Sequence, residues 1–458
     1  MSLEDGGRVH FIGIGGAGMS AIAKVLLERG VEVSGSDLKR STVAIQLEAM
    51  GAFVSVGHDA AHVEGAGVVV ASTAIRASNP ELVAAHERQI RVLSRGEALA
   101  EVLSGGRSII VAGTHGKTTT TSMIVSVLIE AGLDPTYLIG AGLNDSGTNA
   151  RSGSGDLVVA ESDESDGSFL LLRPSIAVVT NVEQDHVDHW ASMAELRDAF
   201  RSFMYSTVED GALIVPCGDP ELTGVAAGSG RRTICFGSDG AVDAAETAFL
   251  DGRTSFVLVA GTEKVPVTLK VPGEHNVSNA LAAAAACLEA GVSLEEIARG
   301  LARYAGVERR FQLRGRVAGV TIIDDYAHHP TEVKATLAAA RSGGWDRVVA
   351  VFQPHRYSRT AAFAQAFGSS FSDADRVVVT DVYGAGEEPV PGVTGKLISD
   401  AVCASSPGRP VAYLPHRAEL VSYLKGSVRS GDAVLTMGAG DVTSLGEELM
   451  LELAGEVP

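Results

Sequence analysis

The sequence predicts an α/β protein with three domains, each a mostly parallel sheet covered by helices. Short apolar segments of strand length alternate with helical segments along almost the whole chain, which is the pattern of parallel α/β domains. At two places a glycine-rich turn follows an apolar strand and opens a helix, as is typical of doubly wound sheets. The length of 458 residues suits several domains of about 100–200 residues each.

Composition and charge exclude several classes of protein. The formal net charge of −19 argues against a nucleic-acid partner, because such binding depends on basic contacts to phosphate. No signal-type segment opens the chain and no run of about eighteen apolar residues follows, so we expect no membrane partner and a cytoplasmic location. The cysteines lie far apart without metal-ligand spacing, and we expect them to be buried thiols: Cys217, Cys235, Cys287 and Cys403.

The first predicted domain covers residues 1–105 and is Rossmann-like. It opens with the strand "RVHFIGIGG", a helix and the strand "VEVSGSD", and further strand segments follow at "AGVVVAST" and "IRVLS". Gly13, Gly15 and Gly18 fit a dinucleotide fingerprint, and Asp37 follows Gly18 after nineteen residues. The same backbone would equally hold the diphosphate of a UDP-sugar, so this pattern leaves both ligands open.

The central predicted domain covers residues 106–312 and is of the P-loop type. Its segment "SIIVAGTHGKTTTTSMIVSVLIEAG" reads as strand, loop and helix, which places free N–H groups and a helix dipole at the loop. Gly116, Lys117 and Thr118 match the end of the pattern G-x-x-x-x-G-K-[ST], although Val111 stands where its first glycine belongs. The lysine can reach terminal phosphates, and the threonine can offer its hydroxyl to magnesium.

Oxygen ligands for a metal ion follow the next strands of this domain. Glu161 comes directly after the strand in "DLVVAESDESD", so it would lie beside the loop at the carboxyl edge of the sheet. The segment "TNVEQDHVDHW" follows another strand and places Asp185 and His186 near the same edge. The remaining acidic residues of the first segment rank lower, because they could form a solvated turn: Asp163, Glu164 and Asp166.

The rest of the central domain adds strands, a hairpin and a helix. Strands are expected at "IAVVTN" and "ALIVP". The alternating segment "TSFVLVAGTEKVPVTLKV" contains a glycine turn and predicts an antiparallel hairpin. The alanine-rich segment "NVSNALAAAAACLEAG" predicts a helix that ends at Gly291.

The third predicted domain covers residues 313–458 and is again Rossmann-like, with strands at "GVTIIDD", "RVVAVFQ", "RVVVTDVY", "VAYLP" and "AVLTMG". Pro330 fits the first turn of a helix. The loop before it then carries five polar side chains: Asp324, Asp325, Tyr326, His328 and His329. Arg356 and Arg359 follow the next strand and could converge on a carboxylate or phosphate, which the planar guanidinium suits.

Eight segments in this order over nearly the whole chain together resemble the Mur ligases of peptidoglycan synthesis: "GIGGAGMS", "GTHGKTTTT", "AESDESDGSF", "NVEQDH", "EHNVSNALAA", "RRF", "DDYAHHPTEV" and "QPHRYSR". No single motif is specific, but the combination is. The phosphate loop of that family has the form G-T-x-G-K-T, which accounts for Val111. The amino-terminal loop of the family holds a UDP-sugar and not NAD, so the resemblance assigns one loop to each nucleotide.

The resemblance implies an ATP-dependent amide ligase that acts in the synthesis of peptidoglycan precursors, on which cell shape and division depend. It implies UDP-N-acetylmuramate, L-alanine and ATP as substrates and Mg²⁺ as the metal. The γ-phosphate would first pass to the lactoyl carboxylate, and the amine of alanine would then attack the acyl phosphate. Three anions must meet, so we expect the protein to contribute mainly positioning and charge stabilisation.

The resemblance also implies roles for single residues, carried over by motif. The residues with catalytic roles are Lys117, Glu161, His186, Arg310 and Asp325. The metal would be held by Thr118, Glu161 and His186. The nucleotide would lie against Gly113, Thr114, His115, Gly116, Lys117, Thr118, Thr119, Asn276 and Asn279. The UDP-sugar would lie against Gly15, Gly16, Gly18, Asp37, Ser72 and Thr73. The alanine end would be formed by Tyr326, His328, Arg356 and Arg359.

The chain departs from several members of that family at one position. Those members carry a lysine after the metal histidine, and its carbamate helps to hold a second magnesium ion. Between His186 and Phe203 this chain has no lysine, only Arg197 and Arg201. Binding of a second metal must therefore depend on other groups, and we expect no stimulation of activity by bicarbonate.

Three other functions compete with this interpretation. A sister ligase that attaches a recycled peptide to the same sugar would share most of these motifs. The hypothesis of a nicotinamide-dependent oxidoreductase depends on the first glycine loop alone, and it gives Lys117 and Glu161 no role. A nucleotide-driven binding module without ligase chemistry would release phosphate in the absence of alanine.

Overall fold

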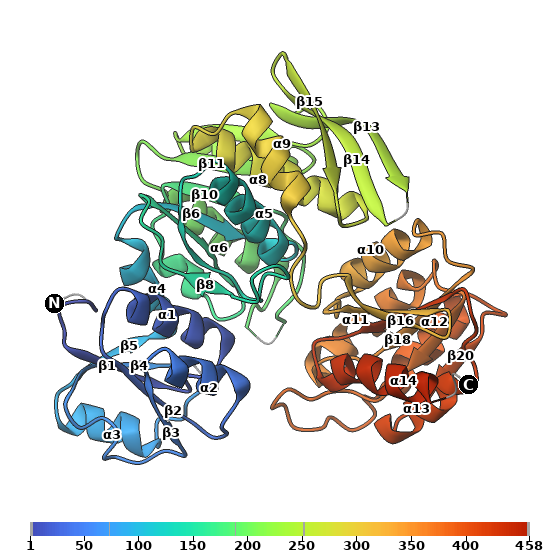
Figure 1. Cartoon of the computed structure of the whole chain (residues 1–458), viewed down its shortest axis with the longest axis horizontal. Coiled ribbons are helices and arrows are strands. Elements are labelled where there is room, and N and C mark those ends of the chain that lie inside the picture. Colours follow the sequence, from blue (N-terminus) through green and yellow to red (C-terminus); the bar gives the residue numbers. More distant parts are fainter. Residues whose placement is uncertain (1–2, 73, 188, 251, 456–458) are drawn as a thin grey trace.

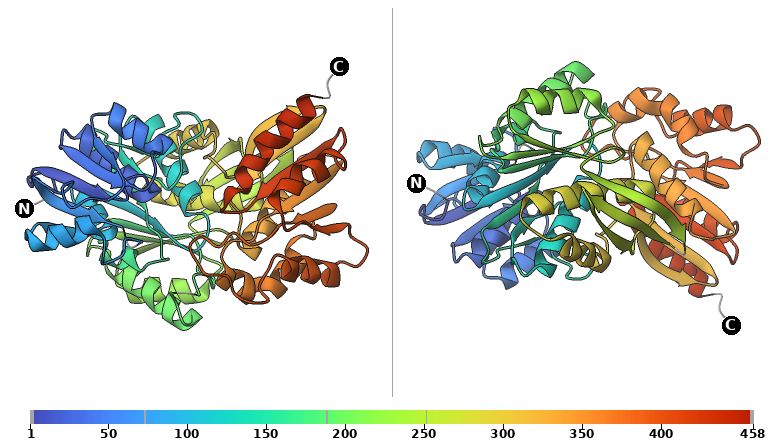
Figure 2. Two further views of the ribbon diagram at one scale, coloured as in Figure 1. Left: turned by 90° about the horizontal axis from the view of Figure 1, so that it is seen from below. Right: turned by 90° about the horizontal axis from the view of Figure 1, so that it is seen from above.

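The structure is a computed structural model that describes residues 3–72, 74–187, 189–250 and 252–455. It contains three α/β domains in sequence order, each built around its own sheet (Figure 1). The central domain lies between the other two, and the two ends of the chain lie on opposite sides of the molecule (Figure 2). The α/β class and the three-domain architecture predicted from the sequence are therefore confirmed.

The first domain has a five-stranded parallel sheet in the order β3-β2-β1-β4-β5. Its strands are β1 (Arg8–Ile12), β2 (Val33–Asp37), β3 (Phe53–Val56), β4 (Ala66–Ala71) and β5 (Arg91–Ser94). Its helices are α1 (Ala17–Glu28), α2 (Thr42–Ala49), α3 (Pro80–Glu87) and α4 (Arg95–Leu103). The strand order reverses between β1 and β4, so the glycine loop after β1 lies at the crevice where such sheets bind ligands.

The central domain has a ten-stranded sheet in the order β15-β14-β13-β12-β11-β10-β6-β9-β7-β8. The strands are β6 (Arg107–Ala112), β7 (Thr136–Leu138), β8 (Ala150–Arg151), β9 (Leu157–Glu161), β10 (Ile176–Val179), β11 (Ala212–Pro216), β12 (Arg232–Phe236), β13 (Val242–Leu250), β14 (Arg253–Ala260) and β15 (Glu263–Leu269). β14 and β15 form the predicted antiparallel hairpin, and β13 extends it by a further antiparallel strand that the sequence analysis missed. In Figure 1 these three strands project above the third domain.

The helices of the central domain are α5 (Lys117–Glu130), which follows the phosphate loop, η1 (Ser168–Leu171), α6 (Met193–Tyr205), α7 (Pro220–Gly228), α8 (Glu274–Glu289) and α9 (Leu294–Arg303). α8 and α9 pack against α5, whereas η1, α6 and α7 belong to a separate apolar cluster. The alanine run of α8 is buried because small side chains let α8 approach both the sheet and α5. α9 comes so close to α5 that a Cβ on Gly300 would lie 2.4 Å from Val127 Cα. The contacts with α8 and α9 therefore hold α5 in place beside the sheet.

The third domain has a six-stranded sheet in the order β16-β17-β21-β18-β19-β20, in which only β16 is antiparallel to its neighbour. Its strands are β16 (Gln312–Val317), β17 (Val320–Asp325), β18 (Arg347–Phe352), β19 (Arg376–Val379), β20 (Val411–Tyr413) and β21 (Asp432–Met437). Its helices are α10 (Pro330–Arg341), α11 (Tyr357–Ser370), α12 (Lys396–Ser405), α13 (Arg417–Lys425), η2 (Asp441–Ser444) and α14 (Leu445–Ala454). Pro330 begins α10, as the sequence predicted.

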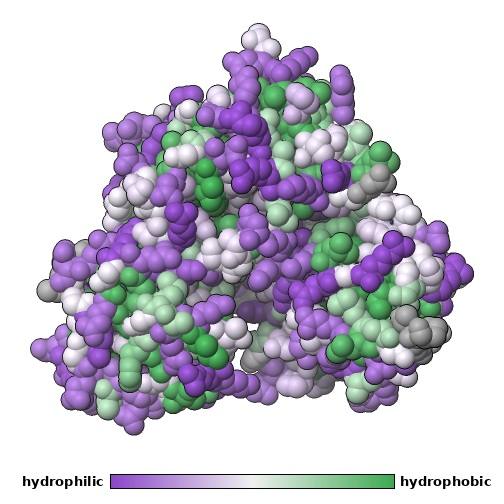
Figure 3. All heavy atoms as spheres, viewed as in Figure 1, coloured by the Kyte–Doolittle hydropathy of each residue, from purple (hydrophilic) through white to green (hydrophobic). Residues whose placement is uncertain are grey.

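The molecular surface in Figure 3 is largely polar, and the four cysteines differ in exposure. The face in Figure 3 is mostly hydrophilic, with apolar side chains in small separate groups. Across the described ranges, no helix is both long enough and apolar enough to cross a membrane. The expectation of four buried thiols was wrong: Cys287 is buried, Cys217 and Cys235 are half-buried, and Cys403 is exposed. Cys403 lies on the outer part of α12, where half of the helix faces solvent.

Candidate active site

The phosphate loop connects β6 to α5 and requires glycine at both ends. Gly113 has a φ of +136°, and a Cβ there would lie 2.1 Å from Thr180 Oγ1 at the end of β10. Gly116 has a φ of +79°, and a Cβ there would lie 2.3 Å from Asn279 Oδ1 on α8. The loop is thus pressed between a neighbouring strand end and a helix, and its N–H groups lie at the amino end of α5.

Lys117 places a positive charge among carboxylates at this loop. Its Nζ donates to Gly113 O at 2.6 Å and to Glu164 Oε2 at 2.7 Å, and it lies 3.6 Å from Asp163 Oδ1. Burial alone would lower the pKa of Lys117, but the carboxylates of Glu164 and Asp163 raise it above its ordinary value. The ammonium therefore stays charged, as a phosphate ligand must.

Asp163 and Glu164, which the sequence analysis ranked low as a solvated turn, lie in the site. Glu164 is only 1% exposed, and its Oε1 lies 3.6 Å from His186 Nε2. Asp163 Oδ1 lies 4.0 Å from the same nitrogen. Burial raises the pKa of Glu164 to about 7, whereas the charge of Lys117 and hydrogen bonds from Ser165 outweigh burial and lower the pKa of Asp163. The turn after β9 folds back over the phosphate loop, which local sequence does not reveal.

Two groups of side chains here offer donors suited to a divalent cation. The first group is Asp163, Glu164 and His186, which each offer one atom, and these atoms lie within 4.8 Å of one another. The second group is Glu161 and Thr118: Glu161 accepts a hydrogen bond from Thr118, and the buried Oε2 of Glu161 has no hydrogen-bond partner among the described residues. Burial raises the pKa of Glu161. Carboxylate and hydroxyl oxygens beside a phosphate loop fit Mg²⁺ in both charge and donor type.

His186 has a constrained backbone and a neutral ring. Its φ of +49° is unusual for a residue other than glycine, and its N–H donates to Asp185 Oδ1 at 2.7 Å. Burial lowers the pKa of His186, despite the opposite effect of Asp185 and Asp163. A neutral imidazole keeps a lone pair for a metal ion or a proton. The turn after β10 therefore aims His186 at the acidic residues.

Asp185 joins this turn to the third domain through a buried ion pair with Arg359. The guanidinium of Arg359 donates to both carboxylate oxygens, with Nε–Oδ1 at 2.9 Å and Nη2–Oδ2 at 3.1 Å. Arg359 is 4% exposed, and Asp185 is 4% exposed. Arg356, one turn earlier, has a φ of +68° and lies 3.9 Å from Glu387 Oε1. In this structure the two arginines therefore point to different carboxylates, and their shared role in holding alanine stays a prediction.

The loop before α10 contributes the other side chains expected from the third domain. The guanidinium carbons of Arg309 and Arg310 lie 4.8 and 5.2 Å from the ring centre of Tyr326. His328 Nδ1 lies 2.9 Å from Tyr326 O, and burial lowers the pKa of His328 to about 4. Asp325 accepts backbone N–H bonds from residues 311 and 327, and burial raises its pKa to about 6.

Most of these side chains line one open cavity of about 590 Å³ between the three domains, whereas Glu164 and Asp325 are not among its lining residues. The predicted residues that line it are Gly18, Thr114, His115, Gly116, Lys117, Thr118, Glu161, His186, Arg310, Tyr326, His328, Arg356 and Arg359. A second cavity, of about 350 Å³, lies between the first and central domains and is lined by Gly15. The predicted sites on the three domains therefore face these two cavities, which lie between the domains.

Around the first glycine loop, Asp37 is bound to the loop itself. Gly15 N–H donates to Asp37 Oδ2 at 2.9 Å, and a Cβ on Gly15 would lie 2.8 Å from that oxygen. Gly16 caps the start of α1. Ser72 Oγ accepts the N–H of residue 74, and Thr73 lies outside the described residues. The contacts of these residues with a UDP-sugar stay predictions.

Asn276 and Asn279 lie behind the phosphate loop. Thr120 Oγ1 donates to Asn279 Oδ1 at 3.3 Å, and Asn279 Nδ2 donates to Asn276 Oδ1 at 3.4 Å. Asn276 Nδ2 donates in turn to Pro272 O at 2.7 Å. In this structure the pair ties α8 to α5, and its predicted contact with the nucleotide is not tested. Thr119 is also on α5 and buried.

Two further residues of the cavity were not singled out from the sequence. Glu332 lies 3.4 Å from Arg310 Nη1 and 3.2 Å from His328 Nδ1. Burial would raise the pKa of Glu332, but the neighbouring His328, His115 and Arg310 outweigh burial and hold this pKa well below its ordinary value. Its sequence position is that of an ordinary helix cap, so no local signal distinguishes it. Arg95 at the start of α4 donates to Asp166 Oδ2 at 3.0 Å and so connects the first domain to the acidic segment.

Comparison with known proteins defines the class. Residues 8–107 match the model "Mur ligase family, catalytic domain", residues 111–287 match "Mur ligase middle domain", and residues 309–440 match "Mur ligase, glutamate ligase domain". The chain belongs to the Mur ligase family, which confirms the resemblance inferred from its motifs.

Within the family, particular relatives are similar over the full chain. UDP-N-acetylmuramate–L-alanine ligase of Renibacterium salmoninarum is 47% identical over 99% of this chain and 97% of that protein. The crystal structure of UDP-N-acetylmuramate–alanine ligase from Thermotoga maritima is 28% identical and covers 98% of this chain and 100% of its own, with a TM-score of 0.83. A murein peptide ligase from Psychrobacter arcticus is 25% identical and covers 99% of this chain and 100% of its own, with a TM-score of 0.72.

Proposed function

We propose that this chain is an ATP-dependent ligase that joins L-alanine to the lactoyl carboxylate of UDP-N-acetylmuramate and releases ADP and phosphate. The observation that carries the proposal is the cavity in which Lys117, the acidic turn after β9 and the polar loops of the third domain meet. The similarity to alanine-adding ligases along the whole chain supports these substrates. Because the substrates are a nucleotide and a nucleotide sugar, we place the reaction in the cytoplasm.

Each domain has one role in the proposal. Residues 1–105 hold the UDP-sugar at the glycine loop, residues 106–312 hold ATP, and residues 313–458 hold alanine. The orientation of the sites supports this division, since the first glycine loop, the phosphate loop and the loops after β17 and β18 all face the two cavities. The carboxylate, the γ-phosphate and the amine can then meet in the central cavity.

Positioning and charge dominate the proposed chemistry, because a carboxylate is a poor electrophile until it is phosphorylated. Lys117 holds the β- and γ-phosphates and follows the γ-phosphoryl group as it moves to the carboxylate. The amine of alanine then attacks the acyl phosphate, a C–N bond forms, and inorganic phosphate leaves. Arg310 lines the cavity, and Asp325 is buried at the end of β17, where it accepts the N–H of the residue that follows Arg310. We assign both to the nucleotide side of the cavity.

Magnesium fits this site through the oxygen-rich residues already described. Thr118, Glu161 and His186 would hold it, with Asp163 and Glu164 as additional donors. The ion would neutralise phosphate charge and so make attack by an anionic carboxylate easier. The sequence analysis ranked Glu164 low as part of a solvated turn; we propose instead that Glu164 takes part of the role that a carbamylated lysine has in relatives.

Phosphate release is the experiment that tests the proposal. The full chain with ATP and Mg²⁺ should release phosphate rapidly only when both UDP-N-acetylmuramate and L-alanine are present. Replacement of alanine by the tripeptide L-alanyl-γ-D-glutamyl-meso-diaminopimelate separates the peptide-attaching sister function. Rapid release with the tripeptide and none with alanine would reverse the proposal, and release without either acceptor would favour a binding module.

A further inference from the structure

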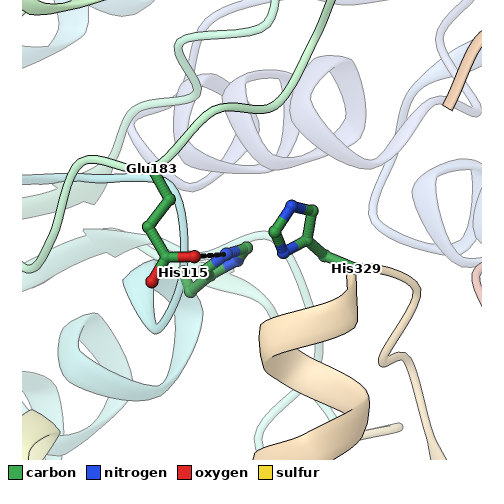
Figure 4. Close-up of side chains that lie close together, drawn as sticks. All are labelled: His115, Glu183 and His329. Carbon is green, nitrogen blue, oxygen red and sulfur yellow. Dashed lines mark ion pairs between the residues drawn. The ribbon is translucent and has the colours of Figure 1, made fainter. Parts of the chain in front are cut away.

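We propose that His115, Glu183 and His329 form a site for a transition-metal ion of the Zn²⁺ class that bridges the central and third domains. The three residues lie on separate elements: His115 in the phosphate loop, Glu183 in the turn after β10, and His329 at the start of α10. Figure 4 shows both imidazole rings and the carboxylate directed toward one another. This group is distinct from the Asp163, Glu164 and His186 group.

The distances place one donor from each residue around a common point. His115 Nε2 lies 3.5 Å from Glu183 Oε2, and the ring centres of His115 and His329 are 4.7 Å apart. One donor atom from each of the three residues lies within 4.8 Å of the other two. In a tetrahedral zinc site with bonds of about 2.0–2.2 Å, ligand atoms lie roughly 3.4 Å apart. His115 Nε2 and Glu183 Oε2 already have this spacing. His329 would have to move toward these two atoms by on the order of 1 Å.

The strongest indication of a missing ligand is the environment of His115 Nε2. This nitrogen is buried, and apart from its 3.5 Å ion pair with Glu183 Oε2 it has no hydrogen-bond partner among the described residues. A buried polar atom without a partner is costly, so its position calls for an explanation. The opposite nitrogen, Nδ1, lies 3.4 Å from Glu332 Oε1, and this carboxylate would orient the ring for coordination through Nε2.

The other two candidate ligands have outer partners as well. His329 Nε2 lies 3.2 Å from Gln184 O, which leaves Nδ1 for a metal, at the loss of a long 3.4 Å bond from Thr331 N–H. Thr331 Oγ1 donates to Glu183 Oε2 at 2.6 Å and fixes that carboxylate. Metal-binding histidines commonly give their second N–H to a carboxylate or a backbone carbonyl, and both arrangements occur here.

Donor type and charge favour a zinc-class cation over magnesium. Two imidazole nitrogens and one carboxylate suit Zn²⁺ or Co²⁺, whereas Mg²⁺ requires oxygen ligands and octahedral geometry. Glu183 and Glu332 both face His115, and against the effect of burial they raise the pKa of His115 to about 9. The cluster therefore binds a proton in the absence of metal, and the ion would replace that proton at His115.

The bridging position has a structural consequence. Glu183 and His115 belong to the central domain and His329 to the third, so a bound ion would oppose separation of the two domains. The same ion would order the phosphate loop, since His115 is two residues from Lys117. The inference concerns binding and does not depend on the identity of the ligase substrates.

Titration of the untagged full chain with Co²⁺ in excess Mg²⁺ tests the inference. We expect one equivalent with the intense visible absorption of four-coordinate cobalt, displaced by Zn²⁺. His329→Gln and Glu183→Gln should each weaken this binding at least about tenfold. His416→Gln is the matched control, because His416 is exposed at the start of α13 and its side chain makes no capping bond. Circular dichroism without metal establishes that each variant folds.

The outcomes separate this site from the neighbouring acidic group. Loss of the cobalt signal in His186→Gln and its retention in His329→Gln would assign the ion to the Asp163, Glu164 and His186 group and overturn the inference. Absence of stoichiometric binding in the unsubstituted chain would also overturn it, leaving His115 as a protonated link between Glu183 and Glu332. Two ligand variants are used so that misfolding of one leaves the other to decide.

Discussion

At the scale of single residues, the phosphate loop holds the ammonium of Lys117 beside the carboxylates of Glu164 and Asp163. Lys117 contacts Glu164 and loop carbonyls, so its charge is held in place before any phosphate arrives. Such an arrangement requires little reorganisation when the γ-phosphoryl group moves, which is the condition under which electrostatic stabilisation is most effective. The lysine is therefore the residue whose loss should affect turnover most directly.

We predict that Lys117→Ala lowers kcat by about a hundred- to a thousand-fold, or about 2.7–4 kcal/mol in activation free energy. The charge matters most while phosphate moves, so binding of UDP-N-acetylmuramate should change little. Steady-state phosphate release measures the first quantity, and calorimetric titration of the sugar nucleotide measures the second. Turnover close to that of the unsubstituted enzyme would contradict the role given to the phosphate loop.

A second feature at the scale of residues lies in the first domain, where one buried carboxylate contacts a serine hydroxyl and several imidazoles. Glu81 is fully buried, accepts a 2.6 Å bond from Ser36 Oγ and lies 2.6 Å from His62 Nδ1 and 2.9 Å from His58 Nδ1. His10 Nε2 is 3.6 Å away. Burial would raise the pKa of Glu81, but bonds from these groups outweigh it and lower the pKa from 4.5 to about 2.

We predict that Glu81 makes stability depend on pH below about 4.5. A carboxyl whose pKa is lower in the folded state stabilises the fold above the unfolded pKa, and this contribution is lost as pH falls from about 4.5 toward 2. Urea unfolding at a series of pH values should show the stability difference between the unsubstituted chain and Glu81→Gln shrinking over that range. Glu87→Gln, an exposed change on the same helix, should show no such trend. A difference that is constant with pH would refute the assignment.

At the scale of elements, α9 packs closely against the carboxyl-terminal half of α5, the helix that follows the phosphate loop. Gly300 lies in the middle of α9, and a Cβ there would meet the backbone of Val127 at 2.4 Å. Ser126 Oγ donates to Gly300 O at 2.8 Å, which further fixes the crossing. Gly224 lies in the middle of α7 with open space at its Cβ position. The two glycines therefore differ in packing while sharing a helical backbone.

We predict opposite effects of alanine at these two positions. Gly224→Ala should raise the free energy of unfolding by about 0.5–1 kcal/mol, because glycine loses more backbone entropy on folding than alanine. Gly300→Ala should lower it by about 1–3 kcal/mol, because α9 must move away from α5. Urea denaturation of both variants measures these changes. Equal stabilisation by the two substitutions would show that α9 is not pressed against α5.

At the scale of the whole molecule, the third domain is joined to the centre through ionic contacts of buried side chains. Arg359 on α11 and Asp185 after β10 form a bidentate pair in which both residues are almost fully buried. Removing one partner of such a pair leaves an uncompensated charge in the interior, which commonly costs about 3–5 kcal/mol. The pair therefore couples the position of the third domain to the turn that carries His186.

We predict that Arg359→Lys raises the KM for alanine much more than the KM for ATP, because lysine cannot keep the bidentate geometry that positions the third domain. Asp185→Asn is the companion variant, and initial rates with each substrate varied in turn provide the measurement. The same pattern in both variants assigns Arg359 a positioning role through Asp185, and an effect confined to Arg359→Lys assigns it to alanine directly. A rise confined to ATP in both would refute a role in alanine binding.

The sequence by itself determined the class of fold and the elements that carry the motifs. Alternating apolar segments, the glycine loops and Pro330 predicted strand ends and helix starts that the structure contains, because such signals act within a few residues. The family followed from the order of motifs. β13 escaped detection because about half of its residues are exposed although it pairs with β12 and β14, so its sequence has no strong apolar pattern.

Only the tertiary structure decided which charged groups meet. Asp163 and Glu164 read as a solvated turn, yet they lie against Lys117 and His186 once β9 and β10 are placed on either side of β6. The Arg359–Asp185 pair joins residues 174 positions apart. Local sequence encodes periodicity and turn chemistry, whereas the partner of a buried charge depends on how whole domains pack, and no spacing along the chain records that packing.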